Sequence, residues 1–589
     1  MLLAVAAAAA ALARSPSCSP VGGQHCCTNC VSGTGAVAPC GPGNQRCTAN
    51  HSDAWVHIQD PSGCGINDVN APFFDPVHKM YHIFYQLHVA QSNGGARCPA
   101  GAQRCPTGEG PVWAHAVSPD LVRWHPLPVA LWNGPQPYDQ KTVASGSATI
   151  VDGKPVIVYA GWGAPNAFAA AVPADASDAL YTNWTKTGVL TYHTDDDPSR
   201  AWRTASGEWR LIANGGASPC NKTLLPLGCA PIWASTDFKN FTLVGATNLP
   251  VGENPSLFEL PPLTPGAHVP NATLPTHGHH WGSYYQVGSW VDGTPGSGNE
   301  HAGRWVGVRG ETDQPVCDRR HCGSGALPGG GTAGGSCDAR CHQFDKGCAA
   351  AHDFWDAKNG RRVLFLWIRG GRGAMTLPRV ITYHPALEQL VTPPLPELAS
   401  LRLAAAAKSA AGSVVVRQPT PLMLGPWPAA KAVEVVTHFA IPSHAVNFSL
   451  SLCAAGGTHC ATASVRCAAA LRSPAGGGVR IRGVTVGLGG AGSDELRLLP
   501  TDSSIELRLF ADAAAVEAYF GGGRVALSSG NIGLPQTFAS AKLVVDAAPG
   551  SDGATVTLLN ATAWPLASIY ATRDEVLKAS AIKTDPRPR

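Results

Sequence analysis

Hydrophobic positions along most of this chain occur in short runs of β-forming side chains, and Gly, Pro, Asn and Asp separate one run from the next. Such runs are typical of strands joined by turns, as in β-propellers, barrels and sandwiches. No helical period is sustained, so the pattern predicts an all-β protein. The clearest runs are residues 80–86 (MYHIFYQ), 155–160 (PVIVYA), 209–213 (WRLIA), 281–287 (WGSYYQV) and 362–368 (RVLFLWI).

A Pro-rich segment at residues 390–396 (LVTPPLP) divides this pattern into two parts. Beyond it, runs such as residues 505–510 (IELRLF) alternate with the period of half-buried strands, which predicts a second all-β domain, a sandwich. We therefore expect a strand-rich domain over residues 51–392 and a β-sandwich over residues 393–589. The Gly-rich residues 323–335 are predicted to form a flexible insert.

Composition narrows the classes of protein that remain. Charged residues make up 14% of the 589 residues, against roughly a quarter in an average soluble protein. The net charge of +3 gives no electrostatic reason to expect a nucleic-acid or anionic-membrane partner. With 66 Gly and 49 Pro besides, the composition argues against coiled coils, helical solenoids and charged disordered tails.

The N-terminal region has the features of a secreted protein. Residues 1–13 (MLLAVAAAAAALA) are apolar and end in small side chains, which is typical of a signal peptide. Residues 14–50 form a Cys-rich arm, and the chain holds 19 Cys in all. Disulfides are the expected state of these residues, Cys348 included. A zinc site in the arm is the alternative, but the arm lacks paired Cys-x-x-Cys halves.

Two further features of the sequence agree with a secreted protein. Outside the N-terminus no run of 18 apolar residues occurs, so we expect no membrane span. Seven Asn-x-Ser/Thr sequons favour a glycosylated protein that is secreted, in the cell wall or vacuolar. They begin at Asn50, Asn183, Asn221, Asn240, Asn271, Asn447 and Asn560.

Three acidic positions stand out because each lies at the edge of a predicted strand among aromatic or turn residues. They are Asp68, Asp197 and Glu253, each more than 50 positions from the next. They meet only if successive β-units converge on one axis, as the blades of a propeller do. Two facing carboxylates are the minimum for glycoside hydrolysis. Taken singly, each is more often a turn or capping residue than a catalytic one.

At these positions the sequence resembles glycoside hydrolase family 32, the invertases, fructan exohydrolases and related β-fructofuranosidases. Similar blocks follow one another in the family's order over most of the chain. They are residues 67–72 (NDVNAP) with 81–86 (YHIFYQ), 113–118 (WAHAVS) with 120–124 (DLVRW), 144–148 (ASGSA), 196–198 (DDP), 253–255 (ENP), 344–347 (FDKG), 376–379 (TLPR) and 507–520 (LRLFADAAAVEAYF).

The resemblance implies a five-bladed β-propeller followed by a C-terminal β-sandwich. It implies that Asp68 is the nucleophile, Glu253 the general acid and base, and Asp197 the stabiliser of the transition state. The expected substrate is sucrose or a fructan, cleaved with retention, with no metal or organic cofactor. The residues expected to hold the sugar are Asn67, Gln86, Trp113 and Ser145.

Several positions depart from the family pattern. Asp196 stands where the family has Arg, which removes a cation from the expected sugar pocket. We hypothesise that Arg200 replaces that cation. The other departures are Val69 for Pro, Ala144 for an aromatic residue and Asn254 for Cys.

Two other functions remain open at this stage. One is a different five-bladed-propeller glycosidase, of the arabinan-cleaving type, which inverts configuration. The other is a catalytically inactive carbohydrate-binding protein on the same scaffold, for which Asp196 is the best argument. The stretch of residues 277–280 (HGHH) allows a metal site, but an exposed loop is the expected structure.

Overall fold

The computed structural model of this protein is almost entirely β-strand in the residues that it describes, which confirms the all-β prediction. The predicted signal peptide, most of the Cys-rich arm and the Gly-rich insert lie outside these residues. The described residues are 30–31, 37–38, 54–61, 65–88, 111–193, 195–215, 229–266, 274–293, 303–308, 342–370, 372–410, 412–417, 422–457, 459–467, 482–530, 534–546 and 555–584.

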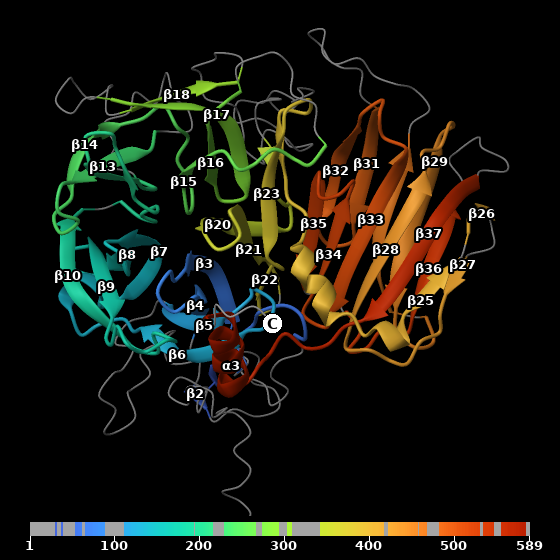
Figure 1. The fold of residues 1–589 in the computed structure, drawn as a ribbon, viewed down its shortest axis with the longest axis horizontal. Helices are drawn as coiled ribbons and strands as arrows, with labels where there is room; N and C mark the ends of the chain where they lie inside the picture. Colours follow the sequence, from blue (N-terminus) through green and yellow to red (C-terminus); the bar gives the residue numbers. More distant parts are fainter. Residues whose placement is uncertain are drawn as a thin grey trace, which may run out of the picture.

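Five small antiparallel sheets come first in chain order within the described part, apart from the short pair of β1 (Cys30–Val31) and β2 (Val37–Ala38). Figure 1 shows them following one another around a common centre, from blue to yellow. Their strands are β3 (Gly65–Phe74), β4 (Tyr81–His88), β5 (Val112–Ser118) and β6 (His125–Leu131); β7 (Thr142–Val151), β8 (Lys154–Trp162), β9 (Ala167–Pro173) and β10 (Trp184–Tyr192); β11 (Trp202–Arg203), β12 (Trp209–Ile212), β13 (Pro231–Ser235) and β14 (Thr242–Ala246); β15 (Ser256–Glu259), β16 (His277–Trp281), β17 (Tyr284–Asp292), β18 (Gly303–Gly307) and β19 (His342–Gln343); and β20 (Cys348–Asp356), β21 (Arg361–Ile368), β22 (Ala374–Met375), β23 (Arg379–His384) and β24 (Gln389–Val391).

The first and last of these sheets are neighbours. Strand β3 lies against β7 of the second sheet and also against β20 and β21 of the fifth. The backbone N–H of Ile66 donates to the carbonyl of Arg372 at 2.7 Å. Phe354, Val363 and Phe365 of the fifth sheet share a buried core with residues of the first. The arrangement therefore returns to its starting point after five sheets.

Turn residues explain why the strands are short and regular. Asp152 and Gly153 join β7 to β8 with φ of 49° and 78°, the conformation that a two-residue hairpin turn needs at both positions. Asp120 and Asp237 each accept two backbone N–H groups from their own turns, after β5 and β13. Local side-chain hydrogen bonds of this kind stop a strand without help from distant residues.

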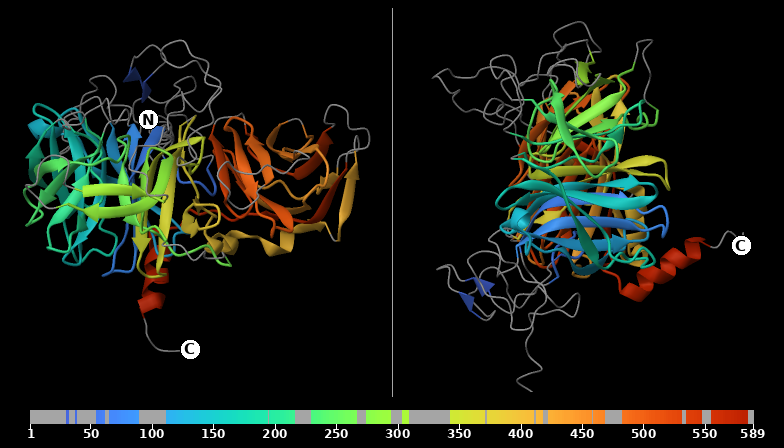
Figure 2. Two further views of the ribbon diagram at one scale, coloured as in Figure 1. Left: turned by 90° about the horizontal axis from the view of Figure 1, so that it is seen from above. Right: turned by 90° about the vertical axis from the view of Figure 1, so that its left-hand side faces the viewer.

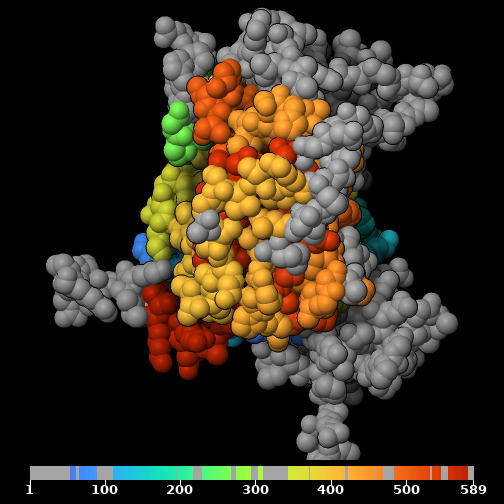
Figure 3. All heavy atoms as spheres, turned by 90° about the vertical axis from the view of Figure 1, so that its right-hand side faces the viewer, coloured from blue at the N-terminus to red at the C-terminus, as the bar shows by residue number. Residues whose placement is uncertain are grey.

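Two larger sheets follow and pack face to face. Val435 and Phe439 from one sheet, with Leu450 and Leu452 from the other, belong to one buried cluster between them. Figure 3 views this pair from its outer side, where gold and orange residues cover much of the surface. The strands are β25 (Lys408–Ala410), β26 (Val414–Arg417), β28 (Ala432–Ala440), β33 (Ser504–Asp512), β34 (Ala515–Phe520), β35 (Val525–Gly530) and β37 (Thr555–Pro565) in one sheet, and β27 (Leu422–Leu424), β29 (Val446–Cys453), β30 (Cys460–Cys467), β31 (Arg482–Leu488), β32 (Gly492–Leu498) and β36 (Ser540–Asp546) in the other.

After β37 the chain leaves this pair and returns to the first small sheet. The N–H of Trp124 donates to the carbonyl of Ile569 at 2.8 Å. Helix α3 (Arg573–Thr584) then packs Val576 against Met80 and Val117, and Figure 2 shows the helix extending from this side. The sequence pattern did not predict this helix, because its apolar positions are few and its partners come from another sheet.

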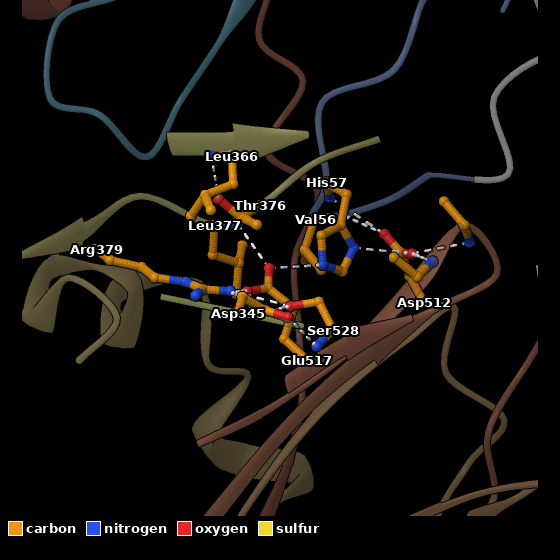
Figure 4. Close-up of polar contacts among 12 residues, drawn as sticks. Val56, His57, Asp345, Leu366, Thr376, Leu377, Arg379, Asp512, Glu517 and Ser528 are labelled. Atoms are coloured by element: carbon orange, nitrogen blue, oxygen red, sulfur yellow. Dashed lines mark hydrogen bonds and ion pairs between the residues drawn. The ribbon is translucent and has the colours of Figure 1, made fainter. Parts of the chain in front are cut away.

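A buried polar network joins the fifth small sheet to the larger sheets (Figure 4). His57 contacts Asp512 at 3.0 Å and Glu517 at 3.1 Å. Arg379 donates to Asp345 at 2.8 Å and to Glu517 at 2.7 Å. The three later sequence blocks, which contain Asp345, Arg379 and both Asp512 and Glu517, therefore meet in this interdomain network.

Charge pairing sets the protonation of this network. Burial opposes charge on His57, but Asp512 and Glu517 outweigh it and raise the pKa of His57 to about 10. Burial acts against ionised Glu517 as well, yet Arg379 and His57 lower the pKa of Glu517 to about 2. The pKa of Asp512 also lies below its ordinary value, because His57 and backbone N–H groups outweigh its burial. Asp512 and Glu517 are therefore paired as ions with His57 and Arg379, whereas burial raises the pKa of Asp345 despite its contact with Arg379.

Two expectations need correction. Cys348 is a buried free thiol rather than half of a disulfide, whereas Cys453 and Cys460 form one. His279 and His280 lie fully buried in β16 rather than in an exposed loop. Both expectations failed because the burial of a strand depends on its neighbours. No group of three or more His, Cys, Asp or Glu side chains able to hold a metal occurs in the described part of the chain.

Where the structure describes the chain, no helix is both long and apolar enough to span a bilayer.

Candidate active site

The predicted catalytic carboxylates lie on, or just before, the first strands of three different small sheets. Asp68 is in β3, Asp197 precedes β11 and Glu253 precedes β15. Burial and the charges of Asp196, Asp68 and Glu253 all raise the pKa of Asp197 well above its ordinary value. Charges act on one another in this way only between near neighbours, and the backbone N–H of Asn254 donates to Asp197 at 3.2 Å, so residues far apart in the chain meet at one site.

Bulges in the first strands direct side chains into this site. The register of β3 on β4 shifts between Ile66 and Val69, around Asp68. The register of β7 on β8 shifts between Val143 and Gly146, around Ser145. A bulge turns a side chain away from the regular alternation of a strand, and bulges are frequent beside active sites.

Gly146 is required for this arrangement. A Cβ at this position would lie 2.1 Å from the carbonyl oxygen of Val158. The close approach of β7 to β8 directly after Ser145 is therefore possible only without a side chain.

A chain of hydrogen bonds holds the Asp68 carboxylate. The Ser145 hydroxyl donates to Asp68 Oδ2 at 2.7 Å, and Gln86 Nε2 donates to Ser145 Oγ at 2.9 Å. Asn67 Nδ2 lies 3.1 Å from Asp68 Oδ1 and 2.6 Å from Gln86 Oε1. His88 Nε2 contacts Asn67 Oδ1 at 2.6 Å. Three predicted sugar-binding residues thus surround Asp68.

Asp197 is tied directly to the Glu253 segment. Its Oδ2 accepts the backbone N–H of Asn254 at 3.2 Å and the side-chain amide of Asn214 at 3.2 Å. Asp197 and Asn254 have φ of 49° and 50°, a left-handed conformation that Asp and Asn tolerate better than most residues. Two strained positions at one site indicate that the surrounding structure imposes this geometry.

Protonation differs between the two principal carboxyls. Burial and the charge of Asp68 raise the pKa of Glu253 to about 7, against the opposing charge of Arg369. Burial also raises the pKa of Asp68, but hydrogen bonds from Ser145 and Asn67 favour its charged form. A carboxyl that keeps its proton near neutral pH can act as a general acid, while its hydrogen-bonded neighbour can act as a nucleophile.

Trp113 lies behind the site. Its exposed fraction is 0%, and its indole N–H donates to the carbonyl of Ala144 at 3.0 Å. In this position Trp113 supports the backbone that carries Ser145. The structure therefore brings together Asn67, Gln86 and Ser145 around Asp68, and gives Trp113 a place in the layer beneath them.

The cation that acts on the pKa of Glu253 is Arg369, not Arg200. The charges that act on Arg200 come from Arg362, Asp353 and Glu259. Arg369, exposed at the end of β21, lowers the pKa of Glu253. The hypothesis that Arg200 replaces the missing cation is therefore not supported.

Sequence reasoning missed Arg369, His88 and the contact of Asp196 with Trp162. Arg369 lies in a Gly-rich turn that carries no spacing signal toward Glu253. Burial raises the pKa of Asp196 to about 6, and the Trp162 side chain hydrogen-bonds its carboxyl while the charge of Asp68 opposes ionisation. Only the tertiary structure shows that Trp162 reaches this carboxyl.

Comparison with known proteins agrees with the geometry. Residues 57–394 match the family model described as the glycosyl hydrolases family 32 N-terminal domain. The chain belongs to glycosyl hydrolase family 32. The matched region contains Asp68, Asp197 and Glu253 together with all four predicted sugar-binding residues.

The sequence is similar to those of plant members of family 32. The chain is 28% identical over 384 residues to beta-fructofuranosidase, insoluble isoenzyme 6, of Oryza sativa subsp. japonica, covering 60% of this chain and 59% of that protein. It is 27% identical over 387 residues to acid beta-fructofuranosidase 4, vacuolar, of Arabidopsis thaliana, covering 59% and 50%. The match therefore spans less than two thirds of the length of these relatives.

Solved family 32 structures share the fold over most of the chain. A variant of fructan 1-exohydrolase IIa from Cichorium intybus, in complex with 1-kestose, has a TM-score of 0.63 at 20% identity, covering 88% of this chain and 99% of that one. A beta-fructofuranosidase from Schwanniomyces occidentalis, complexed with fructosyl-erythritol, has a TM-score of 0.57 at 15% identity, covering 87% and 97%. At these identities the likeness describes the fold.

Proposed function

We propose that this protein is a retaining β-fructofuranosidase that releases fructose from sucrose or fructans. The observation that carries the proposal is the meeting of Asp68, held by Ser145 and Asn67, with Glu253, whose pKa is raised to about 7. Membership of family 32 and the names of the plant relatives support it.

Each carboxyl has one role in the proposed reaction. Asp68 attacks the anomeric carbon of the fructosyl unit, while Glu253 gives its proton to the leaving oxygen. Glu253 then takes a proton from water, which attacks the fructosyl-enzyme and frees Asp68. Two displacements at one carbon give net retention. Asp197 accepts hydrogen bonds from the sugar hydroxyls and stabilises the positive charge that develops on the ring.

The residues around Asp68 orient the sugar in this proposal. Asn67, Gln86 and Ser145 present amide and hydroxyl groups beside the nucleophile, and Trp113 fixes the strand that carries Ser145. We assign no metal or organic cofactor to the reaction, because carboxyl groups supply every proton transfer that it requires.

We further propose that the five small sheets are the blades of a propeller over residues 51–392 and that the larger sheets form a sandwich within residues 393–589. The contacts of β3 with both β7 and β20 support the closed arrangement. We also propose a secreted, cell-wall or vacuolar protein. Support comes from the apolar N-terminus and from the sequons at Asn183, Asn240 and Asn560, whose Asn residues are exposed.

The decisive test is incubation of the purified protein with sucrose and short fructans while free fructose is measured. We expect release by the native chain and none by Glu253→Gln, which keeps the shape of the acid but cannot donate its proton. Absence of release from every fructoside, by protein that is folded by circular dichroism, would contradict the proposal.

Product stereochemistry separates the alternatives. Release of β-fructofuranose, observed by NMR before mutarotation, is expected from a retaining enzyme. Inversion, together with cleavage of arabinan, would favour the other propeller glycosidase. Sugar binding without turnover would favour the inactive carbohydrate-binding protein. The raised pKa of Glu253 beside Asp68 supports an active site over the last alternative.

A further inference from the structure

Asp196 has no task in the proposed reaction, yet its position is closely defined. Its backbone N–H donates to the carbonyl of Asn214 at 2.6 Å, and the N–H of Asn214 returns a bond at 2.8 Å. Its Oδ1 accepts the N–H of Asp197 at 3.0 Å. The Trp162 side chain also hydrogen-bonds the Asp196 carboxyl. An acidic side chain is thus held beside the catalytic centre.

Trp162 is an exposed aromatic residue on a rigid backbone. It ends β8, pairs with Thr142 and accepts the N–H of Lys141 at 2.9 Å, yet 44% of the residue is exposed. The glycines on either side of Trp162 pack closely under the turn of residues 137–139, which precedes β7. A Cβ at Gly161 or Gly163 would lie 2.8 Å or 1.8 Å from a carbonyl oxygen of that turn.

Trp162 lies at the active-site end of the second sheet. Its partner Thr142 is three positions before Ser145, which donates to Asp68. Because a bulge lies between Val143 and Gly146, this separation is shorter than the roughly 10 Å that three regular strand positions span. Trp162 therefore lies within reach of a sugar unit next to the one that contacts Asp68.

The difference in burial between the catalytic carboxylates and Trp162 indicates which sugar unit of the substrate Trp162 contacts. The exposed fractions of Asp68 and Asp197 are 6% and 7%, so the reacting unit occupies the closed end of the site. Trp162 lies on its open side. Because Asp196 also influences the pKa of Glu253, it lies near the bond that Glu253 protonates.

We propose that Trp162 and Asp196 form the binding site for the leaving-group sugar, the unit attached to the fructosyl residue that Asp68 attacks. The exposed face of the indole stacks on the apolar face of that sugar ring. The Asp196 carboxylate accepts hydrogen bonds from its hydroxyl groups. This inference rests on the proposed function and gives the Asp that replaces the family's Arg a role in substrate selection.

The kinetic test compares substrates with and without a leaving-group sugar. We expect Trp162→Ala to lower kcat/KM about tenfold for sucrose and 1-kestose relative to methyl β-D-fructofuranoside, whose leaving group is methanol. Trp162→Phe keeps an aromatic face and is expected to recover most of this selectivity. Loss with sucrose alone assigns the site to a glucosyl unit, and loss with 1-kestose alone assigns it to a fructosyl unit.

The matched control is Trp355→Ala. Trp355 is 41% exposed but lies toward the other end of the innermost strand of the fifth sheet. Its removal is expected to leave all three substrates unchanged. Equal effects of Trp162→Ala on all three substrates, or no effect on any, would overturn the proposed subsite.

A binding measurement tests the subsite independently of turnover. In the Glu253→Gln background, we expect Trp162→Ala to weaken the calorimetric Kd for 1-kestose about tenfold, and fructose itself much less. Unchanged affinity for 1-kestose would overturn the subsite even if fructose is released. Failure of the native chain to hydrolyse any fructoside, with this affinity loss intact, would instead overturn the proposed function alone.

Discussion

Two buried clusters of carboxyl groups in this protein have opposite protonation behaviour. At the candidate active site, burial raises the pKa values of Asp68, Asp197 and Glu253, and neighbouring carboxylates add to the rise at Asp197 and Glu253. In the interdomain network, the pKa values of Asp512 and Glu517 are lowered although both are fully buried, and among the network's carboxyls only Asp345 has a pKa raised by its burial. The residue type and the burial are alike, so neither explains the difference.

The difference lies in the positive charges. His57 and Arg379 are buried in direct contact with the acids of the network. The active site has neutral donors such as Ser145 and Asn67, and its nearest acting cation, Arg369, is exposed to solvent. In the network each buried charge is compensated by a partner, so removal of one partner is costly, whereas the uncompensated carboxyls of the active site hold a proton ready for chemistry.

The largest expected effect separates chemistry from stability. Asp68→Asn should lower the rate of fructose release by at least about a thousandfold, because the nucleophile is lost. Its free energy of unfolding should stay unchanged or rise, since one of several repelling carboxylates is gone. Fructose assays and urea unfolding measure the two quantities. Activity within tenfold of the native enzyme would contradict the assignment of Asp68.

The converse change belongs to the network. Arg379→Met should lower the free energy of unfolding by about 3–5 kcal/mol, because Glu517 loses the cation paired with its buried charge and Asp345 loses its donor. Arg369→Met is the control at an exposed Arg, with an expected change within about 0.5 kcal/mol. Urea unfolding followed by fluorescence compares the two variants. Equal destabilisation by both would remove the contrast between paired and unpaired clusters.

The next largest effect is the dependence of the free energy of unfolding on pH, which should reflect the charges of the network. The pKa of Glu517 is lowered from 4.5 to about 2, so its contribution is present above pH 4.5 and is lost as the pH falls toward 2. The pKa of His57 is raised from 6.5 to about 10, so its contribution is present below pH 6.5 and is lost as the pH rises toward 10.

Together, these two groups make the network's contribution to the free energy of unfolding greatest between pH 4.5 and 6.5. Thermal melts across the pH range, for the native chain and His57→Gln, measure it. Above pH 6.5, the melting temperature of the variant should fall less steeply than that of the native chain. An alkaline decline identical in both proteins would exclude His57 as its source.

The smallest expected effect concerns the activity profile. Loss of the cation in Arg369→Met should raise the pKa of Glu253 and move the alkaline limb of kcat/KM to higher pH. Loss of the anion in Asp196→Asn should move this limb to lower pH, since the Asp196 charge raises that pKa. Profiles with sucrose measure both shifts. Movement of the two variants in the same direction would contradict the proposed electrostatics.

Local sequence patterns were sufficient for much of this protein. Alternating hydrophobic runs and Asp or Gly turns predicted strands because hairpins depend on neighbouring residues, as at Asp152 and Gly153. The resemblance of short blocks to family 32 picked out Asp68 and Glu253, and the family assignment is confirmed. The roles of these residues stay predictions until activity is measured.

Contacts between distant segments could not be predicted in the same way. Nothing near Arg379 in the chain indicates that it pairs with Glu517, and nothing near Trp162 indicates that it reaches Asp196. The burial of His279 and His280 was likewise missed, because the neighbouring strands that cover them come from elsewhere.

By itself, then, the sequence determined the all-β class, the secretory features, the family and the carboxylates to consider. The tertiary structure decided which carboxylates keep a proton and which are paired as ions. The physical reason is that a pKa depends on the distance to other charges and on exclusion of water. Both are set when the five small sheets converge and the larger pair packs against them, and neither is encoded in any local run of residues.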